Sequence, residues 1–508
     1  MKDFIFREFS SALTAVIPAF WADPTGTLTK VLERMRQSEN DSAQKIAGAF
    51  LKLFEQSTTG QIRMYSPVFN SDRSFEDFCL LNGEDRKRYP SSRNPETLNG
   101  SDPDTPGNPI RVGYLLTSAK PFTESGYSER SHQLLNALVE RGVEELAVSR
   151  LGYPATIGRI SRSSTYDVGN VRYSIMMPWV VPCSAEKRIS LSVVHALKAF
   201  ESFQPELIHT TTNFVNAIVA ENVARALEIP WVYEVRGEPH NTWLSKQRMN
   251  LSENAKVSRL YELYKSREAR ATQRADAVIC LSQVSKAKLV NQGVPEGKIE
   301  VIPNGIDERV FQQKYSKLEL RRVLGLKGNR IVGTVSSIVD YEGLDYLIRA
   351  LTLIPDVECL IVGEGEKRPL LEQLSKELGL EERVHFIGRV PSQNVWQWYS
   401  VLDVFVLPRK NLEVCRSVTP IKAMMAQALG IPVIASDLPA LREVTGGVAR
   451  YFTPESVQDL GEALSEVLEL SATDRETLGN KGKEFARKRT WQSNADAMID
   501  LYDRLLQK

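Results

Sequence analysis

The chain has 508 residues, with 64 lysines and arginines against 63 aspartates and glutamates. A chain of this length is too long for one hydrophobic core, so we expect two or three domains. The balanced charge implies no bulk attraction to nucleic acid, and a hydrophobic share of 42% is typical of soluble globular proteins. The five cysteines form neither a CxxC pair nor a Cys/His cluster, which argues against a disulfide framework and a zinc site.

Residues 1–108 are expected to form a mainly helical N-terminal extension that ends in a linker. Within 43–54, apolar residues such as Ile46 and Phe50 recur at helical spacing. Residues 84–109 are polar and contain five prolines, which is typical of a linker. The extension either docks a partner protein or adds stability to the rest of the chain.

The N-terminus does not have the pattern of a secretory signal. Asp3 and Glu8 interrupt the basic region that such a signal requires, and Pro18 breaks the short apolar run that follows. No sequence window approaches a transmembrane span. We therefore expect a cytoplasmic protein, with any membrane contact peripheral and at the inner face of the membrane.

Strands and helices alternate from residue 110, which predicts an α/β domain over 109–308 with a parallel sheet covered by helices on both faces. The loop after its first strand holds a single Gly126 beside Tyr127, and glycine permits close approach of a ligand to the backbone. A later strand ends in Arg236. The expected strands lie at 110–118, 146–154, 171–178, 206–212, 230–238, 275–282 and 298–307.

The alternation restarts and predicts a second α/β domain over 309–490. A helix over 491–508 is expected to pack back toward the first domain. Two such domains in tandem would face a central cleft suited to two substrates. The expected strands of the second domain lie at 330–338, 357–365, 383–390, 403–407 and 432–435.

The stretch 403–444 has the strongest functional pattern. A buried strand ends at a loop of mixed charge, and Thr419-Pro420 is expected to open a helix that ends at Gly430. Ligands bind at the carboxyl ends of strands in open α/β sheets, and the N–H groups at a helix start suit a phosphate. We expect a nucleotide-sugar diphosphate here, with Lys422 placing an ammonium near it. The alternatives are an ordinary crossover unit and a solvated helix lysine.

These motifs resemble glycosyltransferase family 4, retaining enzymes of the GT-B fold that use a nucleotide sugar. The resemblance spans about residues 110–505 in family order. It lies in GYSERSHQLLNALVERG (126–142), IPWVYEVRGE (229–238), ADAVICLSQVSKAKLVNQG (275–293), KIEVIPNGIDERVF (298–311), VSSIVDYEGLDYLIRAL (335–351), LIVGEGEKRPLL (360–371), VHFIGRVP (384–391) and TPIKAMMAQALGIPVIASDLPALREV (419–444).

The resemblance implies an α/β, GT-B architecture of two Rossmann-like domains, the first for the acceptor and the second for the nucleotide sugar. It implies transfer without a metal or other cofactor, from a UDP-type rather than a GDP-type donor. Arg236 and Lys422 would act catalytically by offsetting the diphosphate charge. The implied donor-binding residues are Gly126, Tyr127, Ser337, Gly363, Glu364, Gly365, Phe386, Ile387, Arg389, Glu413, Thr419, Pro420 and Met425.

The sequence departs from the family at its usual glutamate pair. The second glutamate falls on Met425, whose thioether offers no comparable hydrogen bond to the donor. The first falls on Ser417 in a gapless comparison, or on Glu413 through a longer loop.

Two further positions also differ from the family. Where family members often carry basic residues after the first strand of the nucleotide domain, this chain has Ser337 and Glu342. Arg236 stands where a histidine is common; it would pair with phosphate, or form a salt bridge with Glu234 or Glu238.

The leading hypothesis is a glycosyltransferase that extends a cell-surface or secondary-metabolite glycan. Its expected partners are a nucleotide-sugar donor and a glycan, lipid-linked or small-molecule acceptor, with no nucleic acid. The replacement of a glutamate by Met425 favours a different hypothesis, a catalytically degenerate GT-B protein that serves as a binding or partner subunit. A sugar-nucleotide epimerase fits less well, because the carboxylates and histidines that it needs have no place in the pattern.

Overall fold

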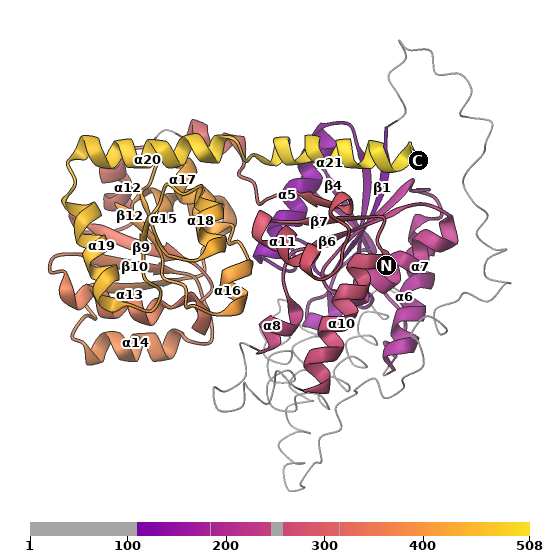
Figure 1. Ribbon diagram of the computed structural model, residues 1–508, viewed down its shortest axis with the longest axis horizontal. Coiled ribbons are helices and arrows are strands. Elements are labelled where there is room, and N and C mark those ends of the chain that lie inside the picture. The colour runs from indigo at the N-terminus through magenta and orange to yellow at the C-terminus, as the bar shows by residue number, and fades with distance from the viewer. Residues whose placement is uncertain (1–108, 183, 245–257, 314, 508) are drawn as a thin grey trace, which may run out of the picture. The chain divides into compact units, whose positions relative to one another are not determined.

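The computed structural model describes residues 109–182, 184–244, 258–313 and 315–507 (Figure 1). The helices expected before residue 109 lie outside these residues. The chain divides into two compact units. Of the described residues, the first unit contains those within 109–235, 266–278 and 499–507, and the second contains those within 236–244, 258–265 and 279–498.

The first sheet has eight strands in the order β3-β4-β2-β1-β5-β6-β7-β8. Its neighbours β1–β2, β1–β5, β2–β4 and β5–β6 are parallel, whereas β3 and β4 form an antiparallel pair that the sequence analysis did not predict. The chain adds strands on one side of β1 and then, from β5, on the other. The strands are β1 (Arg111–Leu116), β2 (Glu144–Ser149), β3 (Thr165–Val168), β4 (Val171–Ile175), β5 (Leu207–Thr211), β6 (Trp231–Val235), β7 (Ala277–Cys280) and β8 (Ile299–Val301).

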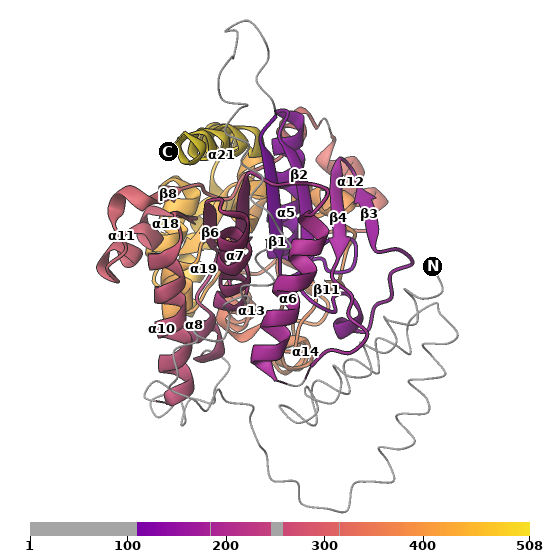
Figure 2. The same ribbon diagram turned by 90° about the vertical axis from the view of Figure 1, so that its right-hand side faces the viewer.

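The helices that accompany the first sheet begin at polar caps. Ser125 accepts a hydrogen bond from the backbone N–H of Ser128 and starts α5, and Asn213 caps α7 in the same way through Val215. Leu134 and Leu138 of α5 are fully buried. The helices are α5 (Gly126–Glu140), α6 (Ala185–Phe200), α7 (Phe214–Leu227), α8 (Pro239–Leu244), α10 (Arg259–Arg274) and α11 (Gln283–Asn291), as Figure 2 shows from the side.

The second sheet has six strands in the order β11-β10-β9-β12-β13-β14, and every neighbouring pair is parallel. The central strand β9 lies between β10 and β12, so the order of the strands reverses there. The strands are β9 (Ile331–Val335), β10 (Glu358–Val362), β11 (Val384–Gly388), β12 (Val404–Leu407), β13 (Val433–Ser436) and β14 (Arg450–Phe452).

Two apolar clusters fill the two faces of this second sheet. One contains Leu347 of α13 and Leu464 of α19, and the other contains Met424 of α17 and Leu441 of α18. Figure 1 shows helices on both faces. The helices are α12 (Lys317–Val323), α13 (Leu344–Ala350), α14 (Arg368–Glu377), α15 (Val395–Ser400), α16 (Glu413–Ser417), α17 (Lys422–Ala428), α18 (Pro439–Thr445), α19 (Val457–Glu469) and α20 (Ala472–Arg487).

The predicted fold class, two Rossmann-like α/β domains, is confirmed by these two sheets. One boundary was wrong: the helix expected from Thr419 begins at Lys422, and a separate short helix, α16, occupies the preceding loop. Pro420 gives the physical reason, because a proline disfavours helical geometry in the residue before it. Among the described residues, no helix is long and apolar enough to cross a membrane.

The last helix, α21 (Trp491–Leu506), places its C-terminal part in the first unit. The hydroxyl of Tyr502 lies 2.7 Å from Nδ1 of His209 in β5, and both side chains are fully buried. His209 also stacks on Tyr114 of β1, with 4.2 Å between the ring centres. The tail is thus anchored to the central strands of the first sheet.

Gly363 follows β10, and a substitution at this position measures how tightly the loops of the second sheet pack. Its φ is +139°, and an added Cβ would lie 1.9 Å from the carbonyl oxygen of Ser336. Because a backbone carbonyl cannot move aside as a side chain can, we expect Gly363→Ala to lower the free energy of unfolding by at least about 3 kcal/mol. Urea denaturation measures this.

Gly379→Ala is the matched control, since Gly379 also has a positive φ, +66°, but nothing within 4 Å of the added Cβ. It should lose only about 1–2 kcal/mol. Equal losses in the two variants would contradict the packing argument.

Candidate functional site

The candidate site lies at the carboxyl edge of the second sheet, where the loops after β9 and β12 meet. In an open α/β sheet the point at which strand order reverses leaves a crevice that binds ligands. The backbone N–H of Lys410 donates to the carbonyl of Tyr341 at 3.1 Å. A Cβ on Gly343 would lie 1.9 Å from the carbonyl oxygen of Pro408. The two loops are therefore in direct backbone contact.

Three charged side chains meet in this contact, and we call them the Glu342 cluster: Glu342, Arg409 and Lys422. Arg409 donates from Nη2 to Oε1 of Glu342 at 3.0 Å and from Nε to Oε2 at 3.2 Å. Nζ of Lys422 lies 2.7 Å from the same Oε1. The cluster joins the loop after β9, the loop after β12 and the first residue of α17.

Burial and opposite charge compete in this cluster. Burial acts to raise the pKa of Glu342, but Arg409 and Lys422 together lower it to about 2. Burial lowers the pKa of Lys422, and the attraction of Glu342 opposes that change. One carboxylate faces two cations, so the cluster carries a net positive charge at neutral pH. That charge suits an anionic ligand.

The exposed part of the cluster belongs to Lys422. Its side chain is 19% exposed, compared with 7% for Arg409 and 3% for Glu342. Among the described residues Lys422 donates only to Glu342, although an ammonium carries three donors. Nearby in sequence, the hydroxyl of Thr419 is buried and has no hydrogen-bond partner within the described part of the chain. Because the Lys422 side chain is mostly buried and pairs with Glu342, the alternative of a solvated helix lysine is wrong.

The glycine turn after β10 lies against the loop after β9. Ile338 donates from its backbone N–H to the carbonyl of Glu364 at 3.0 Å, and a Cβ on Gly365 would lie 2.2 Å from the carbonyl oxygen of Ile338. Ser337, between the two close approaches, is exposed. The structure thus brings together the predicted donor-binding residues Ser337, Gly363, Glu364 and Gly365.

Three further predicted donor-binding residues lie one strand farther out, at the end of β11. Phe386 and Ile387 are half-buried, and Arg389 just beyond them is exposed. The guanidinium of Arg368 lies 5.9 Å from the centre of the Phe386 ring and pairs with Glu364. The carbonyl of Gly388 accepts from the N–H of Gly363 at 2.8 Å, which places this strand end beside the glycine turn.

Glu413 and Met425 do not join the Glu342 cluster. Glu413 starts α16 with a side chain that is 58% exposed, and it pairs with Lys288 at 3.0 Å. Met425 packs against the apolar cluster that also contains Met424 and Leu441. Buried Pro420 lies between Thr419 and the start of α17.

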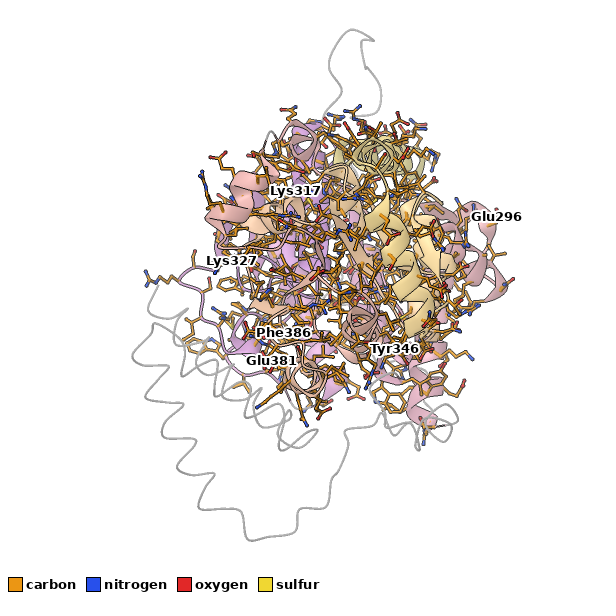
Figure 3. All side chains as sticks on the ribbon, turned by 90° about the vertical axis from the view of Figure 1, so that its left-hand side faces the viewer. Glu296, Lys317, Lys327, Tyr346, Glu381 and Phe386 are labelled. Carbon is orange, nitrogen blue, oxygen red and sulfur yellow. The ribbon has the colours of Figure 1, made fainter. Side chains whose placement is uncertain are left out.

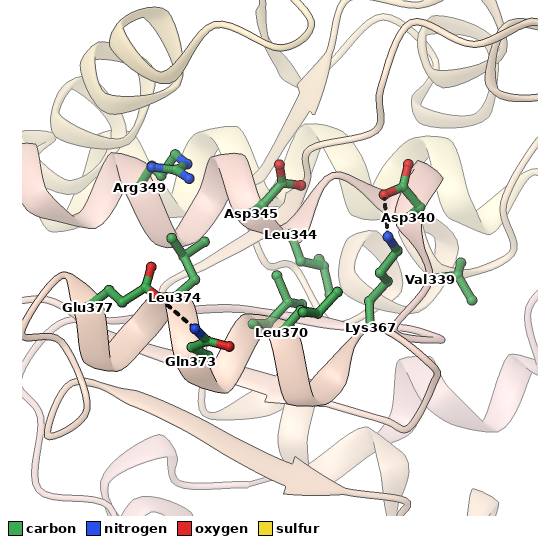
Figure 4. A pocket seen from close by; sticks show the side chains of 11 residues that line it. Val339, Asp340, Leu344, Asp345, Arg349, Lys367, Leu370, Gln373, Leu374 and Glu377 are labelled. Atoms are coloured by element: carbon green, nitrogen blue, oxygen red, sulfur yellow. Dashed lines mark hydrogen bonds and ion pairs between the residues drawn. The ribbon is translucent and has the colours of Figure 1, made fainter. Parts of the chain in front are cut away.

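A pocket of about 320 Å³ lies between α13 and α14 (Figure 4). Leu344 and Leu370 contribute apolar walls, and an ion pair between Asp340 and Lys367, 3.1 Å long, lies at one end. Its lining includes none of the predicted donor-binding residues, so this pocket is distinct from the candidate site.

The first sheet also has an edge at which its strand order reverses, between β1 and β5. Asn216 donates to the hydroxyl of Thr117 at 2.6 Å and to the carbonyl of Thr211 at 3.1 Å, which joins the ends of these strands. Gly126 and Tyr127 are the first two residues of α5, the helix that follows β1 along the chain. Tyr127 is 48% exposed. The sequence analysis missed Thr117 and Asn216, because no pattern distinguishes them from ordinary loop residues.

Arg236 follows β6 and is buried. The two carboxylates proposed as its alternative partners pair with other cations. Arg130 donates from Nε to Oε1 of Glu234 at 2.7 Å, and Nζ of Lys288 lies 2.6 Å from Glu238. Arg130 and Lys288 were not identified from the sequence, because each is distant along the chain from its carboxylate.

A second buried carboxylate of the first unit, Glu268 of α10, supports the start of α7. It accepts from the N–H of Phe214 at 2.8 Å and from the hydroxyl of Tyr233 at 2.6 Å. Burial raises the pKa of Glu268 to about 7, although both hydrogen bonds lower it.

Among the described residues, no group of three or more His, Cys, Asp or Glu side chains is placed to hold a metal ion.

Comparison with known proteins identifies the class. Residues 125–310 match the family model described as Glycosyltransferase Family 4, and residues 316–485 match the model described as Glycosyl transferases group 1. The chain is therefore a glycosyltransferase with the GT-B fold. The succession of the two matches places it among the family 4-like glycosyltransferases.

Curated relatives include an uncharacterized glycosyltransferase of Methanocaldococcus jannaschii, 25% identical over 77% of this chain and 98% of the relative. The lipopolysaccharide core biosynthesis mannosyltransferase LpsB of Rhizobium meliloti is 29% identical over 46% of this chain and 67% of its own length. The D-inositol 3-phosphate glycosyltransferase of Mycolicibacterium vanbaalenii is 28% identical, and the match covers 47% of this chain and 55% of that protein.

Solved structures share the fold. Sucrose-phosphate synthase from Thermosynechococcus elongatus has a TM-score of 0.63 at 21% identity, over 78% of this chain and 99% of that one. HepE from Anabaena in complex with UDP has a TM-score of 0.60 at 19% identity, over 78% of this chain and 100% of that one.

A substitution of Arg409 measures how much the Glu342 cluster contributes to the free energy of unfolding. Arg409→Met leaves Glu342 with one cation in place of two, and we expect it to lower the free energy of unfolding by about 3–5 kcal/mol. Arg442→Met is the control, because Arg442 pairs with Asp437 on the surface of the same unit, where ion pairs contribute little. Urea unfolding should show no measurable change in the control. Similar effects of the two substitutions would contradict the argument.

Glu268 gives a pH dependence of known sign. Between about pH 4.5 and 7 the folded protein retains a proton on Glu268 that the unfolded chain has lost. The stabilisation that Glu268 gives to the folded state is therefore complete below about pH 4.5 and is lost as the pH rises through 7. The unfolding free energy of the wild type relative to Glu268→Gln should fall by roughly 3 kcal/mol across this window. A constant difference between the two proteins would refute the assignment.

Proposed function

We propose that this glycosyltransferase moves a hexosyl or related sugar from a nucleoside diphosphate to a glycan, lipid-linked or small-molecule acceptor, with retention of anomeric configuration. The observation that carries the proposal is the Glu342 cluster at the β9–β12 edge, whose partly exposed cation is Lys422. When the sugar leaves, negative charge develops on the diphosphate, and a fixed cation stabilises that charge.

Within this proposal Lys422 contacts the diphosphate, and the buried hydroxyl of Thr419 donates a hydrogen bond to it. Ser337 and the turn Gly363–Gly365 approach the donor with their backbones, and Phe386 and Ile387 meet its base. Arg236 adds positive charge from the end of β6. No side chain of the site is assigned as a covalent nucleophile, and the reaction needs no metal or other cofactor.

The pathway and the donor follow from the relatives by analogy. LpsB acts in lipopolysaccharide core biosynthesis, and HepE was solved with UDP. We propose a UDP-type donor and a role in cell-surface polysaccharide synthesis, at the cytoplasmic side of a membrane. We propose that residues 1–108 dock a protein partner.

A ligand screen tests the donor site. A ligand that binds only the folded protein raises its melting temperature. We expect a shift with UDP, a smaller one with UMP, which lacks the second phosphate, and none with GDP or ADP. The shift with UDP should persist in EDTA. Absence of any shift with all three diphosphates would refute donor binding.

Met425→Glu separates an active enzyme from a degenerate one. If the donor site has decayed, the wild type will bind no nucleoside diphosphate and Met425→Glu will bind one. If the site is intact, the wild type will release UDP from a UDP-sugar, and proton NMR of the transferred sugar will show the donor's anomeric configuration. An inverted configuration would refute the retaining mechanism.

A further inference from the structure

The proposed function requires an anion to bind at the β9–β12 edge, yet this edge contains a carboxylate, Glu342. Glu342 belongs to the loop after β9, and its Oε1 lies 2.7 Å from Nζ of Lys422. A buried carboxylate this close to a diphosphate would repel it, so its presence needs a reason beyond donor contact. The reason lies in the two cations that it holds.

Arg409 cannot serve as the ligand contact in this arrangement. Its Nε and Nη2 donate to Glu342, and its Nη1 donates to the carbonyl of Val418 at 3.1 Å. The side chain is almost fully buried. Arg409 is thus a fixed anchor for the carboxylate, and the carboxylate in turn fixes Lys422.

The surroundings of Lys422 make Glu342 its main support as a cation. Burial and the nearby Arg409 both act against the charged ammonium, and Glu342 favours it. The neighbouring Cys415 of α16 is neutral, because burial raises its pKa to about 11. Tyr399 of α15 is also neutral, since burial raises its pKa. Within the described part of the chain, Glu342 is therefore the carboxylate that stabilises the Lys422 ammonium.

We propose that Glu342 is a positioning residue for the donor diphosphate: anchored by Arg409, it holds the Lys422 ammonium in place and in charged form at the β9–β12 edge. The inference rests on the proposed function, and it names a residue that never touches the substrate. It predicts that loss of Glu342 changes how binding depends on pH, an effect that a purely structural ion pair would not have.

The test measures binding by calorimetry from pH 7 to 9.5, above the second phosphate pKa of about 6. Each variant is compared with the wild type at the same pH, so that ionisation of the nucleotide base cancels. The probe is UDP, or GDP or ADP if the wild type binds one of those instead. Lys422→Met should weaken binding roughly 10- to 100-fold, because it removes a charge-assisted hydrogen bond. Glu342→Gln should weaken it too, and its affinity should start to fall at a lower pH than in the wild type, as Lys422 loses its proton more readily.

Lys317→Met is the matched control. Lys317 of α12 (Figure 3) also pairs with a carboxylate, Asp403 at 3.1 Å, but Asp403 precedes β12 and so lies at the opposite edge of the sheet. This variant should bind as the wild type does. If Glu342→Gln fails to fold, Glu342→Asp keeps the charge but withdraws it by one methylene. It should bind about tenfold more weakly with a wild-type pH profile.

The outcomes are distinct. If the wild type binds none of the three diphosphates, the proposed function fails and this inference fails with it. If the wild type binds one and Lys422→Met binds equally well, donor binding stands, but the inference is overturned together with the proposed contact between Lys422 and the diphosphate. A Glu342→Gln profile identical to that of the wild type would overturn it too, as would unchanged affinity in Glu342→Asp where the Gln variant cannot be made.

Discussion

The carboxylate of Glu342, shared between Arg409 and Lys422, is the interaction on which the candidate site at the edge of the second sheet depends. Removing these charges from water is unfavourable, and their geometry compensates through a bidentate arginine and a lysine bonded to the same oxygen. The cluster ties together three segments that are far apart along the chain. It also leaves an excess positive charge at the point where an open α/β sheet binds ligands.

The loops around this cluster pack backbone to backbone. Gly343 lies against Pro408, and Gly363 lies against Ser336, at separations that exclude a Cβ. The close approach brings the end of β9 within reach of both β10 and β12. A larger residue at either glycine would separate the loops and with them the charges.

The first sheet uses buried carboxylates differently at its own edge. Glu234 pairs with Arg130 beneath the start of α5, and Glu268 holds the first N–H of α7 and a tyrosine hydroxyl. These acids stabilise the loops after β1 and β5, where Asn216 and Thr117 provide neutral polar groups. Neutral amide and hydroxyl groups suit the hydroxyl groups of a sugar acceptor, whereas the excess positive charge of the Glu342 cluster suits a diphosphate. The contrast agrees with the proposed division between acceptor and donor.

The sequence alone determined the fold class and most strands, because hydrophobic periodicity and glycine turns are local signals, and it predicted a functional centre over 403–444. It also led to Lys422 and Thr419 through motif order. Only the tertiary structure decided that Glu342, first noted as a departure from the family, is the partner of Lys422. Arg409 had no signal of its own in a loop of mixed charge. Pairings between residues 67 and 80 positions apart depend on how the strands are ordered, and no local pattern encodes them.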